Sequence, residues 1–155
     1  MDALVRLTWA EAHFAAMVGV SRQLKAMQAG KSDRFGAEEM DGWGIHIEGA
    51  AAEMCVAKWL GRFWSPSVNT FRAPDLEGGI QVRLRSRHEY ELIVRPTDDD
   101  THRFVHVTGE IPNFRIRGWI TGSDAKREEW EQTHGGRPKA WFVPNDGLNP
   151  LESIF

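Results

Sequence analysis

The chain has 155 residues, of which 41% are hydrophobic, and this size and composition predict one globular domain with a single core. Its formal net charge of -3 excludes a polycation that binds nucleic acid through overall charge, so any nucleic-acid contact must be local. The only cysteine, Cys55, excludes an intramolecular disulfide and favours a reducing, cytoplasmic setting. No stretch approaches the run of about eighteen apolar residues that a membrane span needs, so no membrane partner is expected.

Residues 8–29 are predicted to form the first helix, an N-terminal one. Thr8 and Glu11 have the spacing of a capping box, and Gly30 marks the end of the helix. Gly19 lies inside it, which indicates close packing against another element. The expected buried stripe consists of Phe14, Met17, Ser21, Leu24 and Met27. The polar segment 31–44 that follows is predicted to be the most mobile part of the chain.

A second helix is predicted from about Ile47 to residue 60, and its many small residues allow close approach to a sheet. Glu53 shares one face of this helix with apolar residues at helical spacing, namely Val56, Ala57 and Leu60. An acid on an apolar stripe has two interpretations. It is either a rim residue whose carboxylate reaches water or a member of a site.

From residue 67 the spacing of apolar residues changes to the alternation of strands. Five strands are predicted, over residues 67–72, 79–85, 90–95, 103–109 and 114–120. Their short linkers favour antiparallel pairing. A helix over 122–132 follows, and then a C-terminal segment, 137–155, with one short strand at 140–143 and a tail. This order predicts a single α+β domain over residues 1–155.

A candidate site for phosphodiester chemistry lies around residue 80. Hydrolysis of a phosphodiester commonly uses Mg²⁺ held by converging oxygen ligands, with a cation nearby to offset the charge on phosphate. Asp75 lies just before a predicted turn and Gln81 just after it, so they are expected to approach each other. Arg83 points to the same face as Gln81. The alternative is the solvated face of a sheet, because these polar residues alternate with Ile80, Val82 and Leu84.

These residues resemble the PD-(D/E)xK, or restriction-endonuclease-like, nuclease superfamily. That superfamily has a glutamate on a helix, an aspartate at the end of a strand and an acid-x-lysine motif on the next strand. Glu53 matches the helix acid, with Glu48 as second choice, Asp75 matches the aspartate, and "QVR" at 81–83 occupies the acid-x-lysine place. The resemblance covers about residues 45–130. It implies an α+β fold with a mixed central sheet of about five strands flanked by helices, and with helix 8–29 as an addition.

The resemblance also implies a function, Mg²⁺- or Mn²⁺-dependent hydrolysis of DNA by an endonuclease or exonuclease. The implied catalytic residues are Glu53, Asp75, Gln81 and Arg83, and the implied metal ligands are Glu53, Asp75, Gln81 and Glu48. Two residues depart from the pattern. An amide replaces an acid at Gln81, and Arg83 replaces lysine, so it stabilises phosphate charge but cannot act as a base. Because one chain offers a short groove, cleavage of a duplex implies a homodimer with two sites.

Arginine is the second signal, because fourteen of the nineteen basic residues are arginines and the span 72–117 has eight of them and no lysine. The predicted nucleic-acid contacts are Arg85, Arg87, Arg115 and Arg117. Eight acids in the same span leave a solvated sheet face as the alternative. Two other functions also stay open: a noncatalytic nucleic-acid-binding relative of the nucleases, and a structural or protein-interaction domain with a tryptophan-rich surface.

Two smaller clusters carry weaker signals. His102 and His106 share one face of a predicted strand but lie about 13 Å apart at the rise of a strand, which is too far for one metal ion. The acids Asp98, Asp99 and Asp100 are consecutive and predict a turn.

Overall fold

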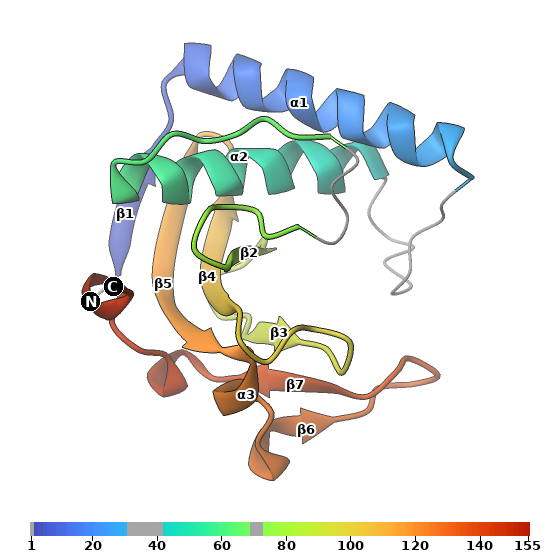
Figure 1. Cartoon of the computed structure of the whole chain (residues 1–155), viewed down its shortest axis with the longest axis vertical. Coiled ribbons are helices and arrows are strands. Elements are labelled where there is room, and N and C mark those ends of the chain that lie inside the picture. Colours follow the sequence, from blue (N-terminus) through green and yellow to red (C-terminus); the bar gives the residue numbers. More distant parts are fainter. Residues whose placement is uncertain (1, 31–41, 69–72) are drawn as a thin grey trace.

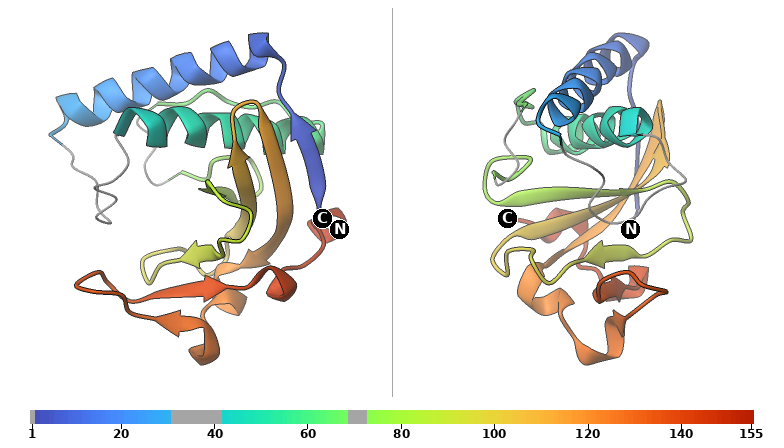
Figure 2. Two further views of the ribbon diagram at one scale, coloured as in Figure 1. Left: turned by 180° about the vertical axis from the view of Figure 1, so that it is seen from behind. Right: turned by 90° about the vertical axis from the view of Figure 1, so that its right-hand side faces the viewer.

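The computed structural model describes residues 2–30, 42–68 and 73–155, and its architecture is α+β. Two long helices, α1 (Trp9–Gln28) and α2 (Gly42–Leu60), pack against each other, and α2 lies between α1 and the main sheet (Figure 1). A second, smaller sheet lies at the end of the molecule away from the helices (Figure 2). None of the helices in the described part of the chain is long and apolar enough to cross a membrane.

The main sheet has four strands in the order β1 (Ala3–Arg6), β5 (Asn113–Thr121), β4 (Arg103–Glu110) and β2 (Ile80–Arg85). β1 and β4 are antiparallel to β5, whereas β2 is parallel to β4. The second sheet has the order β3 (Leu92–Val94), β7 (Ala140–Val143) and β6 (Glu131–Gln132), with antiparallel pairing throughout.

The sequence predicted one mixed sheet of about five strands, and the structure divides the strands between two sheets. β3 pairs with β7 and not with a strand of the main sheet, and β4 then runs in the same direction as β2. The pair β2–β4 is therefore parallel, so the main sheet is mixed, as the resemblance implied, and the antiparallel pairing that short linkers favour is confirmed for the other pairs. The N-terminal strand β1 was not predicted. Of the expected strand 67–72, Ser67 and Val68 are not in a strand, and residues 69–72 lie outside the described residues.

Helix α1 begins with the predicted capping box, because Glu11 N donates to the Thr8 side chain and Thr8 N donates to the Glu11 carboxylate. The predicted buried stripe is wrong: Met17 and Leu24 are 68% and 51% exposed. The residues that α1 buries are small, namely Ala12, Ala15, Val18, Gly19 and Ala26. Small residues allow α1 to approach α2 closely, since a Cβ on Gly19 would lie only 2.4 Å from Ile47 Cα. The segment 31–41, for which mobility was predicted, lies outside the described residues.

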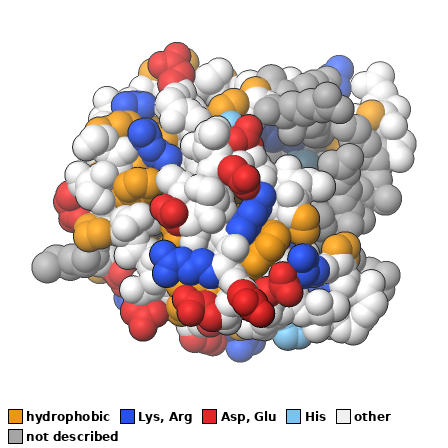
Figure 3. All heavy atoms as spheres, turned by 60° about the horizontal axis from the view of Figure 1, so that its bottom comes forward, with side chains coloured by type: hydrophobic (Ala, Val, Ile, Leu, Met, Phe, Trp, Pro, Cys, Tyr) orange, Lys and Arg blue, Asp and Glu red, His pale blue; other side chains and the backbone are white. Residues whose placement is uncertain are grey.

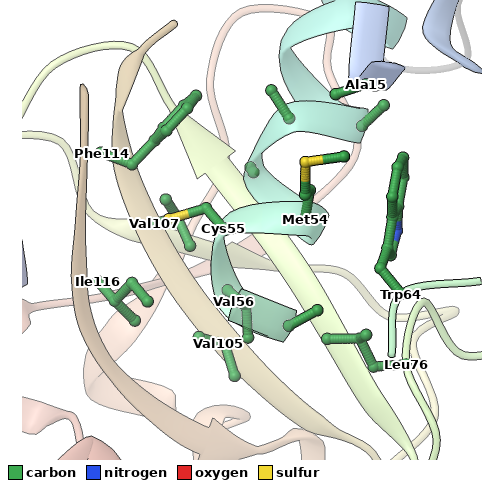
Figure 4. Packing of buried hydrophobic residues seen from close by; sticks show 14 of the residues in the cluster. Ala15, Met54, Cys55, Val56, Trp64, Leu76, Val105, Val107, Phe114 and Ile116 are labelled. Carbon is green, nitrogen blue, oxygen red and sulfur yellow. The ribbon is translucent and has the colours of Figure 1, made fainter. Parts of the chain in front are cut away.

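Helix α2 begins earlier than predicted and is the centre of the larger hydrophobic cluster. All residues from Ala50 to Ala57 are buried because α1 covers one side of α2 and the main sheet covers the other. Figure 4 shows side chains of α2 packed among residues of β4 and β5, with Cys55, Val56, Val105, Val107 and Ile116 labelled. A smaller cluster joins the main sheet to the second sheet and includes Phe104, Ile120, Leu92 and Val143.

The helix predicted over residues 122–132 is also wrong. α3 (Gly122–Ala125) has only four residues and is followed by a 3-10 helix (Glu128–Trp130) and by β6. Lys126 ends α3 with a ψ of 55°, and its ammonium group donates to Asp98 O at 2.8 Å and to the Asp100 carboxylate at 2.6 Å. The lysine therefore fastens the β3–β4 loop instead of extending the helix.

Candidate functional site

Glu53 is a buried acid on α2 that is paired with an arginine from α1. Its side chain is 9% exposed, and its carboxylate receives two bonds from Arg22, Nη1 to Oε2 at 2.5 Å and Nη2 to Oε1 at 3.1 Å. The indole Nε1 of Trp64 donates to Oε1 at 3.3 Å. Because the carboxylate is buried and fully engaged, the interpretation of Glu53 as a rim residue that reaches water is wrong.

Arg22 was not among the predicted site residues. Its Nε donates to Ser67 O at 2.9 Å and its guanidinium carbon lies 6.0 Å from the centroid of the Trp64 ring, so both ends of the group are held. One signal in the sequence could have found it: Arg22 comes three residues after Gly19 and four before Ala26, within the small-residue stripe that α1 buries. A basic residue on that stripe needs an acid partner.

Asp75 lies at the start of a tight turn that leads into β2. Leu76 and Ile80 form an isolated antiparallel bridge, so the backbones of Asp75 and Gln81 lie opposite each other, as the sequence predicted. Gly78 and Gly79 make the turn with φ values of 85° and 71°, which favour glycine. The carboxylate of Asp75 is anchored by a bond of 2.7 Å from Val82 N to its Oδ2.

The two acids act on each other electrostatically. The pKa of Asp75 is raised to about 7, first by burial and second by the negative charge of Glu53, while the Val82 bond and the charges of Arg83 and Arg22 oppose the shift. α2 and the turn before β2 thus bring together the two acids that the sequence singled out. Gln81, on β2, is half-buried.

Arg83, for which a phosphate contact was predicted, is paired with an acid of the β3–β4 loop. Its Nη2 lies 2.6 Å from Asp98 Oδ1, and its guanidinium carbon is 5.1 Å from the Phe104 ring centroid. Its charge still lowers the pKa of Asp75. Among residues 2–30, 42–68 and 73–155, the cation that contacts Glu53 is therefore Arg22, whereas Arg83 is held by the β3–β4 loop.

Glu48 is turned towards the β4–β5 turn. Its Oε2 accepts a bond of 3.0 Å from Ile111 N, and burial raises its pKa. The bond from Ile111 N gives Glu48 a structural partner on the β4–β5 turn, and its metal role stays a prediction. Within residues 2–30, 42–68 and 73–155, no three His, Cys, Asp or Glu side chains form a group that could hold a metal ion.

His46 is a second residue that the sequence reasoning missed. It lies two turns before Glu53 on α2, and its pKa is lowered by burial and then by the charge of Arg22. An imidazole whose charged form is disfavoured is therefore near the guanidinium that holds Glu53.

The four arginines predicted to contact nucleic acid lie in different environments. Arg115 and Arg117 both face Asp2, with N–O distances of 3.7 and 3.1 Å, so much of their charge is offset. Arg85 donates to Glu91 O at 2.7 Å and covers the Tyr90 ring at 4.7 Å. Arg87 has a side chain that is 67% exposed.

Arg83 and Arg85 lie near two further arginines, Arg95 and Arg137. Asp98 joins two of them, since Arg83 Nη2 bonds to Oδ1 and Arg95 N donates to Oδ2 at 2.7 Å. The pKa of Arg95 is lowered by burial and then by the charge of Arg83, with further lowering by Arg137 and Arg85. We call Arg83, Arg85, Arg95 and Arg137 the arginine cluster. Figure 3 shows acids interspersed with basic side chains on the visible face, in keeping with the net charge of -3.

The two histidines of β4 and its preceding loop are separate, as predicted. His106 is completely buried, and its Nδ1 lies 3.1 Å from Asn145 Oδ1. Burial is the main cause that lowers its pKa to about 4. The ring of His102 lies 3.9 Å from the Asp99 carboxylate instead. In the predicted turn, Asp98 binds Arg83, Asp100 binds Lys126, and Asp99 accepts bonds from Thr101.

Comparison of the chain with known proteins shows no relative: no protein-family model, no curated protein and no solved structure matches it.

Proposed function

We propose that this protein is a metal-dependent nuclease that hydrolyses phosphodiester bonds in DNA, with Glu53 and Asp75 as its central acids. The observation that carries the proposal is that Glu53, buried on α2, and Asp75, half-buried in the turn before β2 and held there by Val82 N, lie so close that the charge of Glu53 raises the pKa of Asp75. Burying two acids together is unfavourable unless a cation offsets their charge, and such paired acids are typical of functional sites. A helix acid packed over a mixed sheet also agrees with a restriction-endonuclease-like core.

The acids fit a divalent cation that requires few protein ligands. Mg²⁺ is commonly held by one or two carboxylates and keeps several water molecules, so Glu53 and Asp75 are a sufficient set. The amide oxygen of Gln81, which follows Asp75 across the turn, is the third ligand in this proposal. Mn²⁺ accepts the same oxygen ligands. Such an ion would polarise the phosphate and lower the pKa of a bound water.

Arg22 has two roles in this proposal. In the protein without metal, its guanidinium neutralises Glu53 through the two bonds described above. If the Glu53 carboxylate bound a metal ion, the N–H donors of Arg22 would be available for a phosphate oxygen, which suits the planar geometry of guanidinium. Arg22 would thus add a positive charge beside the acids, while Arg83 keeps the lysine's place in the superfamily pattern.

The arginine cluster would hold the DNA backbone beside the acids. Phosphate contacts position a nucleic acid and give little sequence information, so this cluster supports binding rather than base readout. Because the net charge of the chain is -3, the affinity must come from these local contacts.

A noncatalytic DNA-binding relative is the second candidate. It is favoured by the engagement of both cations near the acids, Arg22 with Glu53 and Arg83 with Asp98, and by the amide at Gln81. In that case binding would depend on salt but not on a divalent metal, since phosphate neutralisation alone supplies the affinity.

Calorimetric titration with Mn²⁺ and Mg²⁺, followed by DNA-binding measurements with and without metal, separates the two candidates. The nuclease proposal requires that wild-type protein binds Mn²⁺ and that Asp75→Asn does not. The matched control is Asp99→Asn, since Asp99 lies outside the acid pair and its own bonds go to Thr101. Equal Mn²⁺ binding by wild type and Asp75→Asn would show that Asp75 is not a metal ligand and would contradict the proposed site. DNA binding without any metal binding would establish the second candidate.

A further inference from the structure

The outward side of α1 is a long apolar surface, and the one exposed charged residue of the helix, Lys25, lies at its edge beside Ser21 and Gln28. We call it the outer face, and its exposed members are Trp9, Ala10, His13, Phe14, Met17, Ser21, Leu24, Met27 and Gln28. Five of these are large apolar residues that are 47–68% exposed. Figures 1 and 2 show α1 at the outside of the fold, with α2 on its inner side. Surfaces of this kind on soluble proteins mark interaction sites.

The spacing of the residues along this face is that of a helix seam. Ala10, His13, Met17, Val20, Leu24 and Met27 follow one another at intervals that alternate between three and four residues. That alternation is the spacing with which one helix packs along another. The inner side of α1 already packs on α2 through its small residues, so this second seam is left for a helix outside the fold.

We propose that the outer face of α1 binds the outer face of α1 in a second copy of this chain, with the two helices antiparallel about a two-fold axis. The seam complements itself in this arrangement, because its six residues form three facing pairs. Ala10 faces Met27, His13 faces Leu24, and Met17 faces Val20, so in the first and third pairs a smaller residue meets a longer one. A two-fold interface requires this kind of self-complementarity.

The area and the charges agree with a second copy as the occupant. A helix of 20 residues is about 30 Å long. Its five exposed large side chains offer about 400–700 Å² of surface, close to the ~800 Å² that each partner buries in a standard interface. No like charges meet along the seam, because none of its six residues is Lys, Arg, Asp or Glu, and the helix dipoles of an antiparallel pair oppose each other favourably. A helix that binds an anionic membrane surface would carry several Lys and Arg around its apolar face, whereas here Lys25 stands alone at the edge and Arg22 turns inward to Glu53.

Phe14 connects this face with the acid pair. Its ring stands edge-on to Trp64 with centroids 5.7 Å apart, and Trp64 donates to Glu53. The dimer is nevertheless independent of the proposed nuclease function, because it rests only on the outer face.

Sedimentation of the full chain at about 1 to 100 µM tests the proposal, because a dimer forms by mass action. We expect a species of twice the 17.6 kDa chain mass at the upper end of that range. Met17→Glu and Leu24→Glu should each give a monomer, and at about 1 µM, where wild type is also monomeric, each should keep the wild-type thermal midpoint, since both side chains are already exposed in one chain. The control is Gln132→Glu on the exposed strand β6, which adds the same charge and should stay dimeric.

Disulfide cross-linking tests the orientation. In the antiparallel dimer, a mixture of Met17→Cys and Val20→Cys chains should cross-link more than either chain alone. The native thiol does not interfere, because Cys55 is buried and its pKa is raised to about 12. A monomer at every concentration, or a dimer that survives both glutamate variants, would overturn the proposal. Stronger cross-linking of each cysteine variant with itself would overturn the antiparallel arrangement.

Discussion

Arg22 of α1 and Glu53 of α2 form a bidentate ion pair inside the protein, with N–O distances of 2.5 and 3.1 Å. The two side chains are only 17% and 9% exposed. This pair fastens the N-terminal helix to the helix that covers the main sheet, and it places a positive charge next to the acid pair. A substitution in this ion pair should therefore change both the stability of the fold and the chemistry of the candidate site.

Removing Arg22 alone should destabilise the fold strongly. Arg22→Met leaves the Glu53 carboxylate buried without its cation, and loss of one partner of a buried pair typically costs about 3–5 kcal/mol of unfolding free energy. The double variant Arg22→Met with Glu53→Leu should recover most of that loss, because no unpaired charge remains. Urea denaturation measures both. A double variant that is no more stable than Arg22→Met would show that packing, rather than the charge, is what the pair contributes.

The free energy of unfolding should depend on pH because of Asp75. The folded-state pKa of Asp75 is about 7, above the unfolded value of 3.8, so the folded protein holds a proton that the unfolded chain has lost. Its contribution is therefore fully present below about pH 4 and is lost as pH rises towards 7, at up to about 1.4 kcal/mol per pH unit. Asp75→Asn should lack this loss. Urea denaturation from pH 4 to 8 gives the difference between the two proteins, and parallel curves would contradict the raised pKa.

His106 should have the opposite effect. Its folded-state pKa is about 4, below the ordinary value of 6.5, because burial excludes the charged imidazole. The unfolded chain binds the proton first, so stability is lost as pH falls from about 6.5 to 4. An NMR titration should show His106 neutral at pH 5, while an exposed residue such as His134 serves as the internal control. A His106 midpoint near 6.5 would contradict the buried environment.

Local patterns in the sequence predicted the elements whose signals are contiguous. The capping box of Thr8 and Glu11 located α1, and alternation of apolar residues located β2, β4 and β5. The contacts of Glu53 and Arg83 could not be read in this way, because Arg22 and Asp98 are distant in sequence and are brought near by packing. The face of α1 was predicted wrongly because size was taken as the guide to burial. Close packing against Ile47 instead selects small residues such as Gly19.

The arginine cluster should control DNA affinity and its dependence on salt. Arg95→Ala and Arg137→Ala should each weaken binding of several DNA sequences to a similar extent, and each should reduce the slope of log affinity against log salt by about 1. Arg115→Ala should have a smaller effect, because Asp2 faces that guanidinium. Fluorescence anisotropy at several salt concentrations is the measurement. A larger effect of Arg115→Ala would place the DNA on β5 instead.

Arg83 should affect catalysis more than folding. Arg83→Ala is expected to lower the cleavage rate by about 10² to 10³, comparable to removal of one preorganised electrostatic donor, and Arg83→Lys should keep or raise it. Because Arg83 bonds to Asp98, the control is Asp98→Asn, which loosens the loop and keeps the guanidinium. Rates that fall equally in Arg83→Ala and Asp98→Asn would assign Arg83 a structural role.

DNA cleavage by the purified full chain in Mg²⁺ or Mn²⁺ tests the central claim most directly. Linear and supercoiled duplexes and single strands should each be offered to wild type, Asp75→Asn, Glu53→Gln and the control Asp99→Asn, with chelator added in parallel. Wild type and Asp99→Asn should both cleave at least one of these substrates. Chelator should abolish this cleavage, and both acid variants should lack it. Cleavage that persists in Asp75→Asn, or no cleavage of any DNA by folded wild-type protein that binds the metal, would contradict the central claim.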